Sequence, residues 1–231
     1  MAINKVVSSF KEAIADVQDG ATIMIAEFTA RGIAKNLILA LRDKGTKNLT
    51  VICNNPSGGW HNPIDVPILI EAGQVKKVIA CWVVLGSPAK VSAVEKRYMA
   101  GEIEIELVPQ GTLVERIRAA GAGIGGFYTP TGVGTAAEEG KEKRFIDGRE
   151  MLLELPLHAD FAFIKAHKAD KMGNLVYRKS ARNYNPVMAT AANITIAEVD
   201  EIVEIGELDP EVIVTPGICV DRIVQAPKEA R

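Results

Sequence analysis

Cysteine and histidine are scarce in this chain of 231 residues, with three of each. The cysteines are Cys53, Cys81 and Cys219, and the histidines are His61, His158 and His167. An odd number of distant cysteines without a C-x-x-C pair excludes a disulfide framework and indicates buried thiols in a reducing compartment. The histidines have no metal-ligand spacing, so we expect no metal site.

The sequence also lacks an excess of positive charge and a membrane-length apolar run, and because it turns polar soon after Met1 we expect no signal peptide. Its net charge of −2 argues against a generic nucleic-acid binder, because such proteins need a concentrated basic face. Apolar residues make up 48% and charged residues 24%, the composition of an ordinary globular protein. We expect a cytoplasmic protein with one domain over residues 1–231, long enough to bury a sizeable core.

Glycine, by contrast, is abundant between residues 121 and 135, where six of the fifteen residues are glycine. Glycine loses more backbone entropy on folding than any other residue, so this density indicates positive φ angles or a close approach of the backbone to another group. Such a loop can direct several backbone N–H groups at one oxygen of an oxyanion, a carboxylate or a phosphate. A tight buried connection without a ligand is the alternative.

Two nucleotide-binding patterns do not fit this stretch. No Gly-Lys-Ser/Thr follows it, which excludes a phosphate-binding loop of that type. Gly121, Gly123 and Gly126 match the letters G-x-G-x-x-G. The Thr129-Pro130 pair opposes a helix there, so we reject a dinucleotide site.

Apolar runs alternate with helical patterns through the first half of the chain. Residues 22–26, 49–53, 77–84 and 103–108 are predicted strands, and residues 6–17, 33–45, 66–72, 89–99 and 113–120 are predicted helices. This alternation predicts an α/β fold, in which right-handed βαβ units form an open, mostly parallel sheet with helices on both faces. Ligands of such sheets bind beyond the carboxyl ends of the strands, so the loops 27–32, 54–63 and 82–87 should converge on one rim. Trp60 and Trp82 lie at or next to these loops, where they either line a pocket or serve packing.

The second half of the chain changes character. Residues 141–149 are charged and contain the turn signal Asp147-Gly148, which indicates a surface connection. Further predicted strands cover residues 160–167, 175–177, 193–203 and 212–215, with a polar turn at 168–174 and a tail at the C-terminal end.

From Gly126 onward an ordered series of motifs resembles the family I coenzyme A transferases, in particular the α (A) subunit of 3-oxoacid CoA-transferases. The motifs are Gly126-Phe127-Tyr128-Thr129-Pro130-Thr131-Gly132, Asp160-Phe161-Ala162-Phe163-Ile164-Lys165-Ala166, Tyr177-Arg178-Lys179-Ser180-Ala181-Arg182-Asn183 and Ile205-Gly206-Glu207-Leu208-Asp209-Pro210. The resemblance runs from about residue 5 to residue 223. The 3-oxoadipate type is the most similar branch, through Pro109-Gln110-Gly111 and Leu155-Pro156-Leu157-His158-Ala159-Asp160.

The resemblance implies an enzyme with two kinds of subunit, such as an α2β2 complex, with coenzyme A as a substrate and no cofactor. A glutamate that belongs to the β subunit attacks an acyl-CoA thioester, which gives an acyl-glutamyl anhydride and CoA thiolate. The thiolate then forms a glutamyl-CoA thioester, which a second carboxylic acid attacks. The α chain alone is then inactive, and its part is to complete the cleft and shape the acyl pocket. The substrate-binding residues implied in this chain are Phe28, Arg31, Gly32, Gly125, Gly126, Phe127, Tyr128 and Thr129.

The N-terminal signature of the family is altered in this chain. Where the family has two glycines before a phenylalanine, Ala26 and Glu27 precede Phe28, and Ala34 replaces a proline. A charged side chain therefore occupies a position where the backbone should approach a ligand. Glu27 is either a general base, which turns transfer into hydrolysis or cleavage of the thioester, or a solvated or ion-paired loop acid.

Basic residues indicate two further contacts. Arg31 and Lys35 lie in position to hold the distal carboxylate of a diacid, or they are surface residues. Arg178, Lys179 and Arg182 form the densest basic cluster, which fits either the phosphates of coenzyme A or a polar interface with the partner subunit. We favour the interface. A non-catalytic homologue that binds a partner or a metabolite is the remaining alternative.

Overall fold

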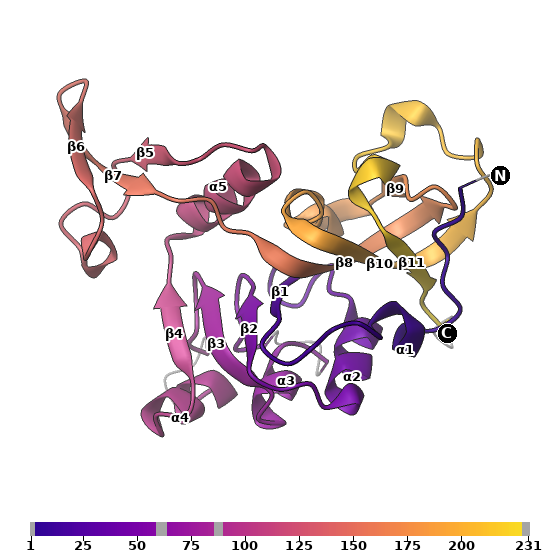
Figure 1. Ribbon diagram of the computed structural model, residues 1–231, viewed down its shortest axis with the longest axis horizontal. Helices are drawn as coiled ribbons and strands as arrows, with labels where there is room; N and C mark the ends of the chain where they lie inside the picture. Colours follow the sequence, from indigo (N-terminus) through magenta and orange to yellow (C-terminus); the bar gives the residue numbers. More distant parts are fainter. Residues whose placement is uncertain (1–2, 59–63, 86–89, 228–231) are drawn as a thin grey trace.

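The computed structural model describes residues 3–58, 64–85 and 90–227, and its centre is a parallel sheet (Figure 1). The strands of this sheet are β1 (Thr22–Ile25), β2 (Leu49–Ile52), β3 (Val75–Ala80), β4 (Glu104–Leu107), β8 (Ala159–Asp170), β9 (Leu175–Val176), β10 (Ala192–Val203) and β11 (Arg222–Gln225). Their order is β11-β10-β8-β1-β2-β3-β4, and all neighbours on this path are parallel, while β9 pairs antiparallel with β8. The predicted α/β fold with an open, mostly parallel sheet is confirmed.

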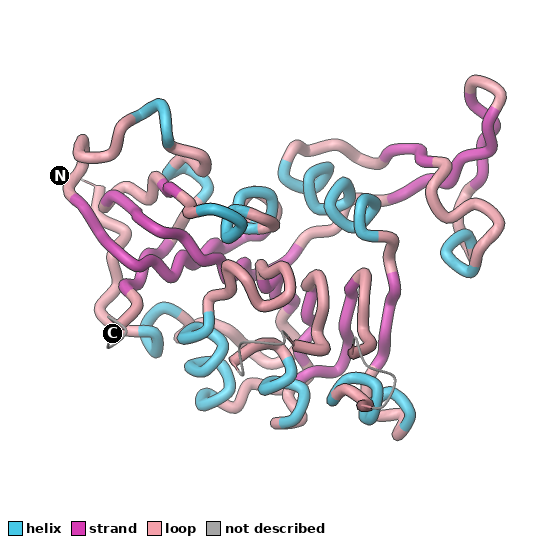
Figure 2. The backbone as a smooth tube through the Cα atoms, turned by 180° about the vertical axis from the view of Figure 1, so that it is seen from behind, coloured by secondary structure: helices cyan, strands magenta, loops and turns pink. Residues whose placement is uncertain are grey.

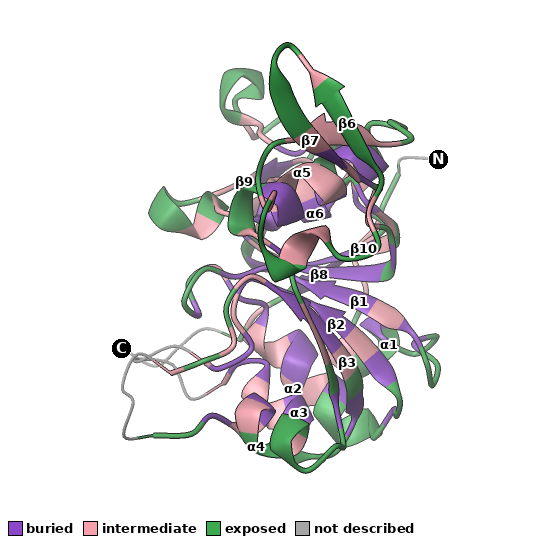
Figure 3. Cartoon of the chain, turned by 90° about the vertical axis from the view of Figure 1, so that its left-hand side faces the viewer, coloured by how far each residue is buried: buried purple, intermediate pink, exposed green. Residues whose placement is uncertain are grey.

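Helices cover both faces of this sheet, as predicted (Figure 1). They are α1 (Phe10–Ala13), α2 (Lys35–Lys44), α3 (Pro67–Glu71), α4 (Ala93–Met99), α5 (Gln110–Gly121) and α6 (Asn185–Met188). In β1, Ile23 and Ile25 belong to the apolar cluster shared with α1 to α4, whereas Met24 belongs to the cluster shared with α5 and α6. Because side chains alternate along a strand, burial of both sets puts the sheet between two helical layers (Figure 3). No helix in the described part of the chain is long and apolar enough to cross a membrane.

The opening helix is shorter than predicted, because part of its sequence joins the sheet. The helix α1 begins after Ser9, whose side chain accepts a hydrogen bond from the backbone N–H of Glu12 at 3.1 Å. Before it, the backbone N–H of Val7 donates to the carbonyl of Ile223 at 2.9 Å. The segment around Ile223 is β11, which occupies the region predicted as a tail. The segment around Val7 thus pairs with the segment around Ile223 near the other end of the chain, and local sequence cannot specify such a pairing.

The predicted surface connection at residues 141–149 is instead part of a projecting arm. Its strands are β5 (Phe127–Thr129), β6 (Lys143–Ile146) and β7 (Arg149–Glu154), in the antiparallel order β5-β7-β6. Asp147 and Gly148, at φ 49° and 77°, form the two-residue turn of a hairpin, so the turn itself was located correctly. The arm extends away from the body of the molecule (Figure 1), and Phe145 on it is 73% exposed.

Two smaller predictions in the second half are also wrong. The strand β8 continues to Asp170 because β10 pairs with it over its full length, so the polar turn begins only after that residue. Residues 212–215 do not form a strand: a 3₁₀ helix covers Pro210–Val212, and a single bridge joins Thr215 to Leu175. Proline at the first helical position and the side chain of Asp209, which accepts the N–H of Glu211 at 3.0 Å, favour that helical turn.

Candidate active site

The loops that follow β1, β2 and β3 converge at one edge of the sheet, as predicted. Seen from behind, these strand ends lead into loops on the side of the sheet toward α5 (Figure 2). They enclose a cavity of about 410 Å³, here called the rim cavity. Its lining among the described residues is Phe28, Thr29, Asn54, Asn55, Gly58, Cys81, Trp82, Val84, Leu85 and Gln110. Trp60 and His61 lie outside the described residues.

Glu27, two residues after the end of β1, is enclosed by these loops and is 0% exposed. Its Oε2 accepts a hydrogen bond from the backbone N–H of Ala30 at 3.1 Å, and its Oε1 accepts one from the backbone N–H of Asn55 at 2.6 Å. Of the alternative that Glu27 is a solvated or ion-paired loop acid, the solvated form is wrong, because the folded chain closes over the side chain.

The surroundings of Glu27 change its acidity. Burial, and after it the nearby Asp65 carboxyl group, raise the pKa of Glu27 to about 8, although the N–H groups of Asn55 and Ala30 lower it. A carboxyl group with a pKa near neutrality is suited to proton transfer. Glu27 does not itself line the rim cavity, however, so a catalytic use of it stays a prediction.

Phe28, Arg31 and Gly32, three of the predicted binding residues, share one turn. Phe28 is 45% exposed and lines the rim cavity. The other two are held from outside: Asn183 Nδ2 donates to the carbonyl of Arg31 at 2.8 Å, and Asn185 Nδ2 donates to the carbonyl of Gly32 at 2.9 Å. The structure therefore puts Phe28 at the cavity, whereas contact of Arg31 or Gly32 with a substrate stays a prediction.

Alanine at position 32 is expected to destabilise the protein more than alanine at position 123. Both glycines have positive φ, +65° and +67°, so each substitution costs about 1–2 kcal/mol of backbone strain. A Cβ on Gly32 would also lie 2.6 Å from the carbonyl oxygen of Ala181, whereas a Cβ on Gly123 meets nothing within 4 Å. Urea unfolding should show Gly32→Ala to be less stable than Gly123→Ala by about 1–3 kcal/mol. Equal losses would mean that the contact with Ala181 relaxes without cost.

Asn54 organises a polar cluster in the wall of the rim cavity, which the sequence did not reveal. Its Oδ1 accepts hydrogen bonds from Gln110 Nε2 at 2.7 Å, from the Tyr184 hydroxyl at 3.1 Å and from the Cys81 thiol at 3.0 Å. Burial raises the pKa of both Tyr184 and Cys81, so both remain neutral donors near pH 7. The sequence did place Asn54 in a predicted rim loop after β2, and it placed Gln110 in a motif that resembles the 3-oxoadipate branch. Nothing in the sequence joins Asn54 to Tyr184, 130 positions away.

The glycine-rich stretch does not lie at the rim cavity. The predicted binding residues within it, Gly125, Gly126, Phe127, Tyr128 and Thr129, connect α5 to the arm and do not line that cavity. A Cβ on Gly126 would lie 3.1 Å from the carbonyl oxygen of Glu154, so close packing inside the arm accounts for glycine there. The strand β5 follows Gly126, and not a helix, as the Thr129-Pro130 pair predicted. Substrate contact by these residues stays a prediction.

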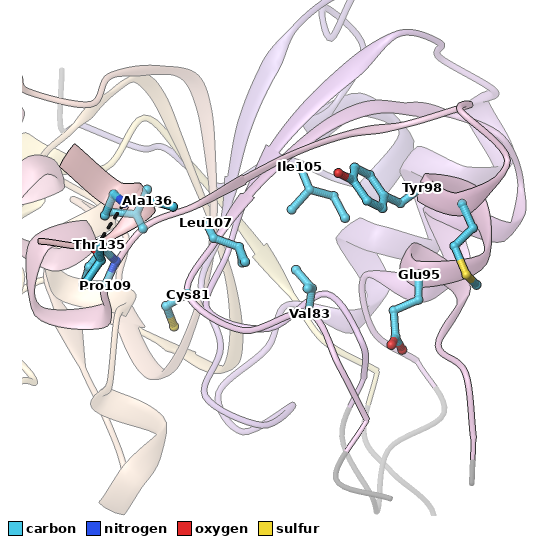
Figure 4. Close-up of a pocket in the computed structure, with 12 residues that line it drawn as sticks. Cys81, Val83, Glu95, Tyr98, Ile105, Leu107, Pro109, Thr135 and Ala136 are labelled. Carbon is cyan, nitrogen blue, oxygen red and sulfur yellow. Dashed lines mark hydrogen bonds between the residues drawn. The ribbon is translucent and has the colours of Figure 1, made fainter. Parts of the chain in front are cut away.

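A second cavity of about 670 Å³ lies between the arm and the edge of the sheet. Thr135 and Ala136, at the end of the glycine-rich stretch, line one side, and Ile105 and Tyr98 line the other (Figure 4). Cys81 lies between these two sides and also lines the rim cavity. The glycine-rich stretch therefore reaches this second cavity through its last residue, Thr135.

The segment that carries the basic cluster lies next to the turn formed by Phe28, Arg31 and Gly32. Arg178, Lys179 and Arg182 are exposed, and the segment that carries them leads into Asn183, which holds the turn at Arg31. Their proposed contact with a partner subunit stays a prediction. In the part of the chain that the structure describes, no three histidine, cysteine, aspartate or glutamate residues gather as a metal site.

Comparison with known proteins identifies the family of this chain. The family model described as coenzyme A transferase matches residues 7–226. The chain is 52% identical to the A subunit of the 3-oxoadipate CoA-transferase of Pseudomonas putida, over 96% of this chain and 94% of that one. It is 50% identical to the A subunit of the probable succinyl-CoA:3-ketoacid coenzyme A transferase of Bacillus subtilis, over 96% and 90%. It is 47% identical to the alpha subunit of the acetate CoA-transferase of Escherichia coli, over 94% of each.

Solved structures share the fold. The decarboxylase AibA/AibB superposes with a TM-score of 0.80 at 26% identity, over 97% of this chain and 84% of that chain. The acyl-CoA transferase YdiF of Escherichia coli O157:H7, solved as a thioester complex with CoA, superposes with a TM-score of 0.82 at 24% identity. That match covers 99% of this chain and 48% of YdiF. From the extent of the family match and the identity to these relatives, the chain belongs to the coenzyme A transferase family.

Proposed function

We propose that this chain is the A-type component of a heteromeric 3-oxoacid CoA-transferase. The enzyme moves coenzyme A from an acyl-CoA donor such as succinyl-CoA to a 3-oxo acid, with 3-oxoadipate as the first candidate. The observation that carries this proposal is the 52% identity, over 96% of the chain, to the 3-oxoadipate CoA-transferase component of Pseudomonas putida. Relatives named for 3-ketoacids and for acetate are nearly as similar, so the class of reaction is better supported than the acid.

The composition of the rim cavity supports a partner subunit. Its described lining residues supply amides, a thiol, aromatic rings and aliphatic side chains, but no carboxylate. The family chemistry requires a glutamate that attacks the thioester. A carboxylate brought by a B subunit would fill this need, and relatives named as A or alpha subunits point to the same kind of assembly.

In this proposal the chain forms one wall of a shared cleft. The side-chain amides of Asn54 and Gln110 face the acyl group, where N–H donors stabilise negative charge on a carbonyl oxygen. Phe28 and Trp82 provide apolar surface that keeps water from the anhydride. Arg31, Gly32 and residues 125–129 complete the substrate contacts from the subunit boundary, and the basic cluster docks the B subunit.

The isolated chain is expected to show no CoA exchange, and the complex with its B subunit is expected to exchange CoA at an enzymatic rate. The reason is that the nucleophile resides in the partner. The measurement is transfer from succinyl-CoA to a panel of 3-oxo acids and acetate, with the two separated subunits as controls. Exchange by the isolated chain would contradict the proposal.

Two other outcomes would favour the alternatives. Net thioester hydrolysis by the complex, without transfer to an acid, would favour a hydrolase that uses Glu27. Formation of a stable complex without turnover of any thioester would favour a non-catalytic homologue. The structure gives the hydrolase limited support, because a fully buried carboxyl group cannot reach a water molecule in the cavity without a rearrangement.

A further inference from the structure

The turn at residues 28–31 is strained and needs support from outside itself. Phe28 and Arg31 exchange two backbone hydrogen bonds, at 3.1 and 3.0 Å, which leaves Thr29 and Ala30 as a two-residue hairpin loop. These two residues have φ angles of 50° and 61°. Such turns favour asparagine and glycine, and a β-branched or alanine residue there costs about 1–2 kcal/mol. Contacts with the rest of the chain must therefore hold the turn in this shape.

The carboxyl group of Glu27 supplies such a contact and joins two loops in doing so. One oxygen binds the N–H of Ala30 at 3.1 Å, within the strained turn. The other binds the N–H of Asn55 at 2.6 Å, in the loop after β2. Phe28 and Asn55 line the rim cavity, so this one side chain connects the loops that form two of its walls.

The other side of the turn is already fixed. Asn183 binds the carbonyl of Arg31, and Asn185 binds the carbonyl of Gly32, which anchors the turn to the segment around α6. Those contacts set where the turn lies, but they do not connect it to the loop after β2. The carboxyl group of Glu27 makes that connection, since its two oxygens bind one loop each.

We propose that Glu27 is a positioning residue, whose carboxyl group ties the turn at 28–31 to the loop at 54–55 and thereby sets the width of the rim cavity. It acts through Phe28 and Asn54 and does not touch the reacting atoms. Its kinetic consequence rests on the proposed CoA-transferase function, in which the acid acceptor binds between these loops.

Glutamine at position 27 is expected to raise KM for the acid acceptor about fivefold or more, with kcat changed less than about twofold. An amide has one acceptor oxygen, so Glu27→Gln keeps one of the two contacts and lets the loops separate. A loss of kcat of about 100-fold or more at unchanged KM would instead identify a general base and overturn the proposal. If kcat falls by the same fraction as the amount of folded protein while KM is unchanged, the role of Glu27 is merely structural, and this result would also overturn the proposal. The variant is assayed in the complex of both subunits.

Hydrogen exchange of the full-length chain tests the tie independently of activity. In Glu27→Gln the amide hydrogens of Ala30 and Asn55 should exchange at least about tenfold faster, a loss of protection worth about 1.4 kcal/mol. The matched control is Glu12→Gln, which neutralises an exposed carboxylate on α1 whose Oε2 accepts the backbone N–H of Ser8 at 2.8 Å, and it should leave both amides and the kinetics unchanged. If the wild-type complex transfers no CoA, the proposed function fails, but hydrogen exchange still tests whether Glu27 holds the two loops together. Unchanged protection at both amides would refute that role of Glu27.

Discussion

Glu27→Gln is expected to remove most of the pH dependence of the free energy of unfolding between about pH 4.5 and pH 8. The pKa of Glu27 is raised from its usual 4.5 to about 8, mainly by burial and then by Asp65. The folded state therefore holds the proton more tightly than the unfolded chain does. This stabilisation is complete below pH 4.5, declines as the pH rises and is lost above pH 8.

The expected size of this effect is large for one residue. Each pH unit inside the window changes the free energy of unfolding by about 1.4 kcal/mol, so the full change is on the order of 5 kcal/mol. Glutamine does not ionise and lacks this slope. The other titratable neighbours, Cys53, Cys81 and Tyr184, have raised pKa values and stay neutral through the window.

Urea unfolding at pH 5, 6.5 and 8 would measure the slope in wild type and variant. Glu12→Gln is again the matched control, because the pKa of exposed Glu12 is lowered, chiefly by its hydrogen bond to the Ser8 side chain, and it contributes no slope above pH 4.5. Parallel stability profiles for wild type and Glu27→Gln would contradict the prediction.

Glu198→Ala is expected to lower the free energy of unfolding by about 3 kcal/mol. Glu198, on β10, is 0% exposed and accepts the backbone N–H groups of Asn36 and Leu37 at 2.9 and 3.2 Å. These belong to the first turn of α2, whose N-cap residue, Ala34, makes no side-chain hydrogen bond. Glu198 also lies 3.5 Å from Lys165 on β8. Alanine would leave the N–H groups of Asn36 and Leu37 without this acceptor, whereas Lys165 keeps its ion pair with Asp200 at 2.7 Å.

The same strand offers a matched control for this prediction. Glu201 lies opposite Lys168 in the register that sets Glu198 opposite Lys165, and it pairs with that lysine at 2.9 Å. Its side chain is 49% exposed, so Glu201→Ala should cost less than about 1 kcal/mol. Chemical unfolding of both variants decides the matter. Similar losses of unfolding free energy in the two variants would show that the burial of Glu198 and its contacts to α2 add nothing to stability.

Much of the fold could be predicted because it depends on local patterns. Short apolar runs separated by helical stripes gave the parallel sheet, its two helical layers and the convergence of three loops on one rim. Errors arose where a distant partner decided the outcome. Val7 joined the sheet because Ile223 was available to pair with it, and residues 143–154 became strands because they pair with each other and with β5.

The candidate site was only partly accessible to such reasoning. Phe28 was identified by its motif, and the structure finds it at the rim cavity. The composition of the glycine-rich stretch led to the prediction that it binds a ligand, yet composition does not distinguish close packing inside the arm from contact with a ligand. No sequence pattern indicated that Tyr184 belongs to the site, because its position beside Asn54 depends on how α6 packs against the sheet.

By itself the sequence determined the order of strands and helices in the first half of the chain, the family and the identity of the altered residue at position 27, since each of these is encoded in neighbouring residues. Tertiary structure alone decided whether Glu27 meets water or backbone amides. That outcome depends on two loops from different strands closing over one side chain, which replaces its hydration with two N–H donors and leaves the carboxyl group holding its proton near neutral pH.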